Sequence, residues 1–207
     1  MNSLLNLPLF IKALDQLTLP HEMPFKINLL TWALSYAKYT EQPRLEAILH
    51  GIRGTCHMQN LQGNQEENLE YALADFNAVL EVFTSATDVV APREWAEIRC
   101  NRGTAYYNRT RGDRANNLEQ ALADFDAALE VFTRDTWPLD WAMTLDSRGI
   151  VYSERVSGQP TDNLQQAIAD FNAALTIFSY ETAPDRHHDL YLQRLHAQQQ
   201  LDRLLSL

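Results

Sequence analysis

Three arginines and three aspartates recur in this chain at one fixed distance. Each arginine stands 22 residues before its aspartate, although the arginines interrupt stretches with the apolar spacing of buried helices. A guanidinium buried alone is costly, whereas a carboxylate can meet it with two charge-assisted hydrogen bonds. The spacing therefore predicts structural ion pairs between helices, which are Arg53 with Asp75, Arg102 with Asp124, and Arg148 with Asp170.

Patterns typical of enzymes and metal centres are missing from the sequence. It contains no G-x-S-x-G, P-loop, Rossmann glycine or H-E-x-x-H pattern. The histidine-rich stretch with His187, His188 and His196 has spacings that do not gather its side chains into a preformed zinc site. Cys56 and Cys100 make no metal or disulfide framework. We therefore expect no catalytic residue, no metal and no cofactor.

The elements that must hold the ion pairs belong to a repeated unit. Three near copies occur in the sequence: NLEYALADFNAVLEVFT from Asn68, NLEQALADFDAALEVFT from Asn117, and NLQQAIADFNAALTIFS from Asn163. Each copy follows a proline and an arginine ten residues apart, and the same pair recurs once more as Pro184 and Arg194. Self-similarity at a fixed period predicts stacked units that bury a continuous core only together. Arg194 has no following aspartate, so we expect it to reach back to Asp170 or to stay exposed.

Each unit is predicted to form two helices. A proline at positions 92 and 138 suits the first helical turn, and a glycine at positions 63, 112 and 158 supplies the matching stop. The second helix is expected to open near Asn68, Asn117 and Asn163, and it keeps apolar residues at i, i+3, i+4 and i+7. The prediction is an all-α fold, an α-solenoid of stacked antiparallel helix pairs with about 8–9 helices.

The proline positions also predict the division of the chain. We expect N-terminal capping helices with a degenerate half-repeat, then three repeats, then a C-terminal capping helix. The boundaries are 1–42 for the N-terminal part, 43–183 for the repeats (43–91, 92–137 and 138–183), and 184–207 for the C-terminal helix. The leading apolar helix can be a cap laid on the stack or an arm for oligomerisation or docking, and the sequence leaves both open.

The motif around Asn101-Arg102-Gly103-Thr104-Ala105-Tyr106, followed by Ala121-Leu-Ala-Asp-Phe125, resembles the tetratricopeptide repeat in its common bacterial form. The resemblance covers roughly residues 43 to 195. The period of 46 to 49 residues exceeds the usual 34 of that family, and His57 and Gln198 stand where tyrosines are expected. HEAT and armadillo repeats fit the period better but fit these motifs less well.

Composition limits the partners. The chain has 207 residues and a net charge of −10, with 17 basic residues against 27 acidic ones. Because nucleic-acid binding needs clustered lysine and arginine, a nucleic-acid partner is not expected. No apolar run of 18 residues and no signal-peptide pattern occur in the sequence, so we expect no membrane insertion and a cytoplasmic location.

The resemblance implies a binding surface. In tetratricopeptide proteins the first helices of the repeats line a concave face, so the resemblance implies a scaffold or adaptor that binds a peptide or protein there. The partner-binding residues implied are Glu97, Cys100, Asn101, Thr104, Tyr107, Asn108, Met143, Asp146, Ser147, Ile150, Ser153 and Glu154. Their acidic members favour a basic or neutral partner. The alternative is a structural or regulatory subunit that assembles as a homo- or hetero-oligomer through its apolar N-terminal or C-terminal cap.

Overall fold

The computed structural model describes residues 7–14, 16–83 and 92–206. These residues form nine α-helices and one short 3-10 helix, and no strand occurs among them. The predicted all-α class is confirmed. The chain divides into two compact units, residues 1–84 and residues 85–207, and each is described by itself.

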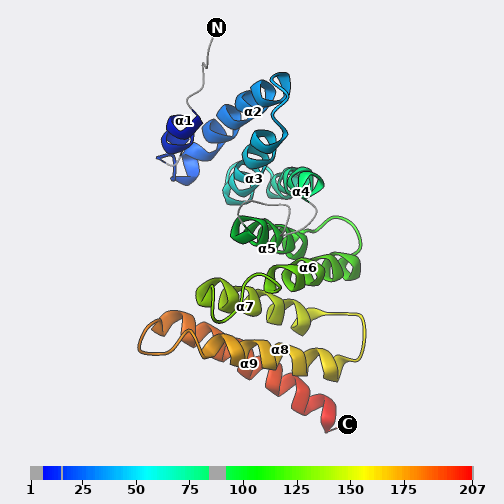
Figure 1. The fold of residues 1–207 in the computed structure, drawn as a ribbon. Helices are drawn as coiled ribbons and strands as arrows, with labels where there is room; N and C mark the ends of the chain where they lie inside the picture. The colour runs from blue at the N-terminus through cyan, green and yellow to red at the C-terminus, as the bar shows by residue number, and fades with distance from the viewer. Residues whose placement is uncertain (1–6, 15, 84–91, 207) are drawn as a thin grey trace. The chain divides into compact units, whose positions relative to one another are not determined.

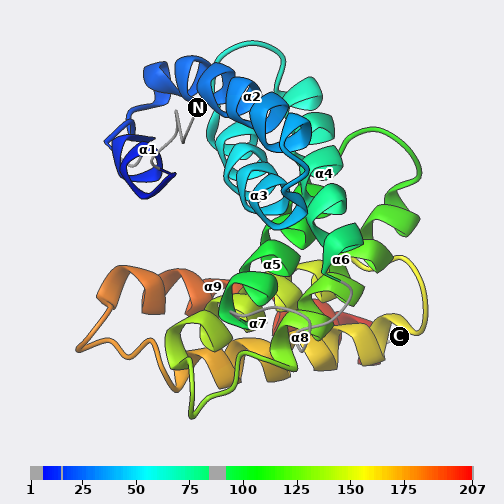
Figure 2. The same cartoon turned by 45° about the horizontal axis from the view of Figure 1, so that its top comes forward.

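The first unit holds α1 (Leu7–Leu14), the 3-10 helix (Pro20–Glu22), α2 (Met23–Tyr39), α3 (Pro43–Gln59) and α4 (Gln65–Val82). Helix α3 packs against α2 on one side and against α4 on the other (Figures 1 and 2). The hydrophobic core of this first unit includes Leu14, Leu30 and Leu49, all nearly inaccessible to solvent. Residues 1–6 of the predicted N-terminal cap and residues 84–91 of the predicted first repeat lie outside the described residues.

The second unit holds α5 (Pro92–Asn108), α6 (Arg114–Leu129), α7 (Pro138–Glu154), α8 (Pro160–Leu175) and α9 (Pro184–Leu205). Each helix packs against the next one along the chain, and α7 also contacts α5 and α9 directly. This is the stacking of neighbouring antiparallel helix pairs that defines an α-solenoid (Figure 1). The exact repeat boundaries given above stay predictions.

Prolines and glycines mark the ends of the helices. Proline is the first residue of α3, α5, α7 and α9, where its missing N–H would have no partner in any case. Gly63, Gly112 and Gly158 lie in the turns inside the pairs with φ between 78° and 80°. Residues with a Cβ rarely adopt this conformation, so the turn requires glycine.

The repeated asparagines Asn68, Asn117 and Asn163 lie inside the first turn of the second helices, close to the predicted helix starts. Helices α4, α6 and α8 begin three residues before Asn68, Asn117 and Asn163 respectively. The buried side chain of Asn117 donates from Nδ2 to the carbonyl oxygen of Arg111 at 2.8 Å, and Asn163 donates in the same way to Ser157 at 2.8 Å. Each asparagine therefore ties the preceding turn to the second helix, because it satisfies carbonyl groups that the turn leaves unpaired.

Close packing inside each pair depends on small residues in the first helix. A Cβ added at Gly149 would lie 2.8 Å from Cε1 of Phe171, and one added at Gly103 would lie 3.0 Å from Cε1 of Phe125. Both phenylalanines are buried, so their rings have no room to move aside. The Arg-Gly sequence thus brings the two helices of a pair into contact beside the ion pair.

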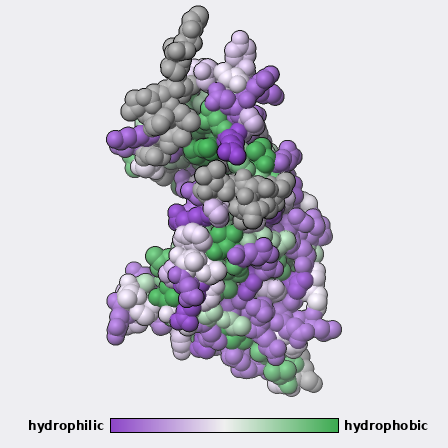
Figure 3. Space-filling model, in the orientation of Figure 1, coloured by the Kyte–Doolittle hydropathy of each residue, from purple (hydrophilic) through white to green (hydrophobic). Residues whose placement is uncertain are grey.

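Surface character follows from this packing. On the face shown in Figure 3, the second unit presents mostly hydrophilic residues with small hydrophobic areas between them. Within the described part of the chain, no helix has both the length and the apolar character of a membrane span.

Candidate interaction site

The three ion pairs predicted from the spacing of 22 residues are present, one in each helix pair. In the pair of α5 with α6, Arg102 donates from Nε and Nη2 to the two carboxylate oxygens of Asp124 at 2.8 and 2.7 Å. Arg148 binds Asp170 with the same two atoms at 2.8 and 2.7 Å. Arg53 binds Asp75 at 2.9 and 2.7 Å. Each arginine thus binds its buried aspartate in a bidentate way. This contact fixes the register of the two helices of the pair.

Each aspartate also has a further partner that the spacing did not predict. Nδ1 of His50 lies 2.7 Å from Oδ1 of Asp75, and Nη1 of Arg99 donates to Asp124 at 2.9 Å. Burial alone would raise the pKa of Asp75, but the hydrogen bonds from His50 and Arg53 outweigh it and lower that pKa. His50 and Arg99 each stand three residues before the arginine of the pair, so the repeat register could have revealed them.

The arginines also reach the helix before their own pair. Nη1 of Arg148 donates to Asp126 of α6 at 2.7 Å, and Nη1 of Arg53 donates to Thr31 of α2 at 3.0 Å. One guanidinium thus joins three successive helices. Arg194 instead lies with its guanidinium carbon 5.2 Å from the centroid of the Tyr191 ring, and it forms no ion pair within the described residues.

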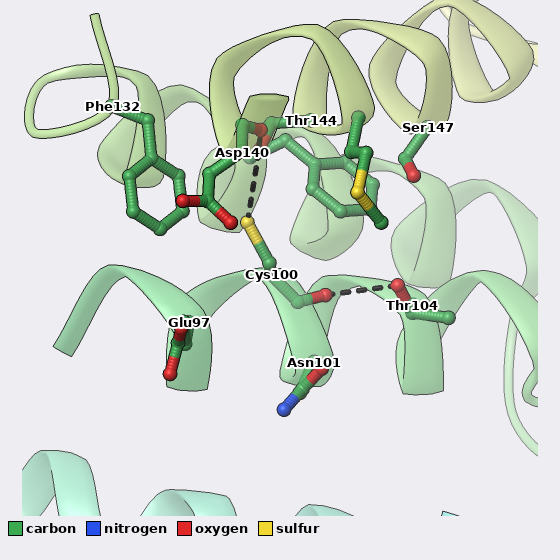
Figure 4. Close-up of a pocket in the computed structure, with 10 residues that line it drawn as sticks. Glu97, Cys100, Asn101, Thr104, Phe132, Asp140, Thr144 and Ser147 are labelled. Carbon is green, nitrogen blue, oxygen red and sulfur yellow. Dashed lines mark hydrogen bonds between the residues drawn. The ribbon is translucent and has the colours of Figure 1, made fainter. Parts of the chain in front are cut away.

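A pocket of about 310 Å³ lies between α5 and α7, and we call it the α5–α7 pocket. Six of the predicted partner-binding residues line it: Glu97, Cys100, Asn101, Thr104, Met143 and Ser147. Four lining residues were not predicted: Phe125, Phe132, Asp140 and Thr144. Figure 4 shows the polar and acidic side chains around the central Cys100, with Phe132 on the side of Asp140. The pocket therefore combines an apolar wall with acidic groups.

Two carboxylates, those of Glu97 and Asp140, line the pocket, and the guanidinium of Arg93 lies beside them. Nη2 of Arg93, from the first turn of α5, lies 2.9 Å from Oε1 of Glu97 and 3.2 Å from Oδ2 of Asp140. Burial raises the pKa of Glu97, and Asp140 adds to that rise while Arg93 opposes it. With two carboxylates facing one guanidinium, the pocket suits a positively charged or neutral ligand.

The environment of the thiol in the pocket favours its protonated form. Burial raises the pKa of Cys100 to about 12, and its Sγ lies 3.2 Å from Oγ1 of Thr144. A thiol with such a pKa stays protonated at neutral pH, whereas the thiolate is the reactive form. In the part of the chain that the structure describes, no three His, Cys, Asp or Glu side chains are grouped so as to hold a metal ion.

Three predicted residues lie together beyond the pocket, at the far ends of α5 and α7. Oη of Tyr107 donates to Oε1 of Glu154 at 2.6 Å, and Nη2 of Arg114 donates to Oε2 of the same carboxylate at 2.6 Å. Burial, with the bond to Glu154, raises the pKa of Tyr107 to about 12. Asn108 is exposed nearby and donates to the carbonyl oxygen of Thr104. These residues form a surface network that continues the face of the pocket.

The prediction for Asp146 requires a correction, because this residue does not lie on an open surface. Asp146 is 3 % exposed and its Oδ2 lies 2.8 Å from Nη2 of Arg186 in α9. Ile150 is half-buried against the hydrophobic core that includes α9. Ser153 is also half-buried, and its hydroxyl donates to the carbonyl oxygen of Gly149. Arg186 of α9 pairs with the buried Asp146, which removes Asp146 from the candidate site, whereas the partner-binding role of Ile150 stays a prediction.

Comparisons of the chain with protein-family models, with curated proteins and with solved structures found no match.

Proposed function

We propose that this protein is a non-catalytic interaction scaffold of the tetratricopeptide type, which binds a protein or peptide segment in the α5–α7 pocket and along the adjoining first helices. The observation that supports this most is the pocket itself, since six residues expected to contact a partner line one cavity. Met143 is half exposed there and offers an adaptable apolar contact beside the acidic groups. We place this scaffold in the cytoplasm as part of the same proposal.

The proposal is tested by capture of partners from the native host with the purified chain, followed by mass spectrometry. Glu97→Lys reverses a charge inside the pocket, while Glu130→Lys makes the same change at an exposed position at the end of α6. We expect Glu97→Lys to abolish capture of the specific partner and Glu130→Lys to leave it intact. Equal capture by both variants would exclude the pocket as the binding site.

A second function is favoured by exposed aromatic residues on the first unit. Phe25, Trp32 and Tyr39 lie on α2 with 59 %, 57 % and 87 % of their surface exposed. A group of exposed aromatic side chains is typical of interaction surfaces, so the alternative is a structural subunit that assembles through this end. Light scattering after size-exclusion chromatography decides between them, because only the alternative predicts an oligomer that Trp32→Glu dissociates.

A further inference from the structure

The second unit contains two equivalent sites between first helices, of which the α5–α7 pocket is one. The same packing occurs between α7 and α9, and its residues follow those of the pocket by 46 positions in the sequence. The third residue of the later helix is Asp140 in α7 and Arg186 in α9. The two copies can therefore be compared position by position, and one of them shows what kind of side chain fills such a site.

In the copy between α7 and α9, the chain fills the site with its own arginine. Nη2 of Arg186 lies 2.8 Å from Oδ2 of the buried Asp146. Its guanidinium carbon lies 5.8 Å from the centroid of the Phe178 ring. A charge-assisted hydrogen bond and an aromatic face are two contacts by which proteins bind arginine. The site between α7 and α9 therefore binds an arginine side chain, which is Arg186 of the same chain.

In the α5–α7 pocket, the equivalent arginine is missing. Asp140 stands in place of Arg186, and Cys100 stands in place of Asp146. The aromatic wall is kept, because Phe132 stands in place of Phe178 and lines the cavity. Phe132 and Asp140 both line this pocket, and both are labelled in Figure 4. An aromatic ring and a carboxylate are therefore present, whereas α7 contributes no cation.

Arg93 neutralises only part of the charge. It contacts both Glu97 and Asp140, yet it is not among the residues that line the cavity, so it lies at the edge of the cavity. Two carboxylates against one guanidinium leave a formal charge of −1 among these three residues. A second positive charge is therefore favoured at the pocket, and the cavity of about 310 Å³ has room for a long side chain.

We propose that the α5–α7 pocket binds an arginine side chain of a protein partner, with its guanidinium against Phe132 and paired with Asp140 and Glu97. The proposal rests on the function proposed above for the same groove, and it adds the chemical class of the residue recognised. The occupant contacts the aromatic wall as Arg186 does between α7 and α9, but its carboxylate partners are Asp140 and Glu97, because Cys100 stands in place of Asp146. Arg93 competes with it for the same two carboxylates.

The full-length chain labelled with ¹³C in its methionine methyl groups tests this by nuclear magnetic resonance. Met143 lines the pocket, and Met23, buried in the other unit's core, is an internal control. The probes are N-acetyl-L-arginine amide, the corresponding lysine amide and the uncharged norleucine amide. We expect the arginine probe to shift the Met143 methyl signal in a saturable way without moving that of Met23. No such shift, or an equal shift with lysine or norleucine, would overturn the proposal.

Three variants sharpen the test. Asp140→Asn should weaken binding of the arginine probe about tenfold, since one charge-assisted hydrogen bond is lost. Arg93→Ala should strengthen it several-fold, because the competitor is removed, and this gain cannot come from misfolding. The double variant Cys100→Asp with Asp140→Arg copies the arrangement between α7 and α9, so it should fold normally and no longer respond to the probe.

The outcome is separable from that of the proposed function. If the arginine probe leaves Met143 unmoved while Glu97→Lys still abolishes partner capture, the arginine inference is overturned and the groove remains a binding site. If Arg93→Ala weakens probe binding instead of strengthening it, the inferred competition is refuted.

Discussion

Removal of the Asp124 carboxylate is the sharpest test of how the helix pairs are held together. Asp124 is fully buried and accepts three hydrogen bonds, two from Arg102 and one from Arg99. Asp124→Ala would leave two guanidinium groups without their carboxylate, and breaking a buried ion pair costs about 3–5 kcal/mol. Because the side chains of Arg102 and Arg99 are 16 % and 21 % exposed, water can reach part of each. We therefore expect a loss of about 3 kcal/mol in the free energy of unfolding.

The assay is urea unfolding followed by circular dichroism, with a thermal scan as a second measurement. A loss of this size corresponds to a fall of about 10 °C in Tm for a unit of this length. Asp126→Ala, on the same helix, is the matched control, because its carboxylate is 52 % exposed and accepts one bond from Arg148. Its expected cost is below about 1 kcal/mol. A loss for Asp124→Ala that does not exceed the loss for Asp126→Ala would refute the structural role of the buried pairs.

Three other predictions follow from the structure. Burial raises the pKa of Asp146, so its ionised form lowers the free energy of unfolding at neutral pH, and this cost disappears as the pH falls and the carboxylate is protonated. Asp146→Asn should therefore raise the free energy of unfolding by about 1 kcal/mol at pH 7, and this gain should be lost in unfolding measurements near pH 4. Gly149→Ala should destabilise by about 1–3 kcal/mol in urea unfolding, because its Cβ would meet the Phe171 ring, and an unchanged midpoint would argue against that contact. Cys56 and Cys100 should resist Ellman's reagent at pH 8 in the native chain and react after unfolding, since burial raises both pKa values; rapid native reaction of either would contradict this.

Sequence spacing predicted the ion pairs and the helix pairs because both repeat with the unit. The distance of 22 residues between Arg102 and Asp124 is constant only if one helix pair is built in the same way each time. The prolines that begin α5 and α7, and the turn glycines with positive φ, act locally and can be read without knowledge of the tertiary structure.

The candidate site was predicted only in part, since it depends on contacts between repeats. Asp146 is buried because Arg186 of α9 pairs with it. Helix α9 belongs to the incomplete last unit, where the repeat pattern in the sequence is weakest. Phe132 was missed because the resemblance assigns partner contacts to first helices, and Asp140 was missed because it stands outside the positions of α7 that the resemblance assigns. Phe132 lies in the segment that follows α6, and this segment brings its side chain to the wall of the pocket.

The role of Asn117 was also beyond local patterns. The predicted helix start near Asn117 came from the beginning of the repeated apolar stretch, which does not show what the asparagine side chain binds. In the structure the N-cap of α6 is Asp113, whose side chain accepts from the backbone N–H of Asn116, while Asn117 is buried and bonded to the turn. The second role requires a turn folded back on the helix, which no helix-start rule describes.

The central claim is that the α5–α7 pocket binds a protein segment, and site-specific photocrosslinking in the native host tests it most directly. A benzophenone side chain at Met143 would lie in the pocket, whereas one at Gln120, exposed on α6, lies outside it. The account predicts one discrete crosslinked protein from position 143, none from position 120, and loss of the crosslink when Asp140→Arg is added. Equal crosslinking from both positions, or a crosslink from position 143 that Asp140→Arg leaves unchanged, would contradict it.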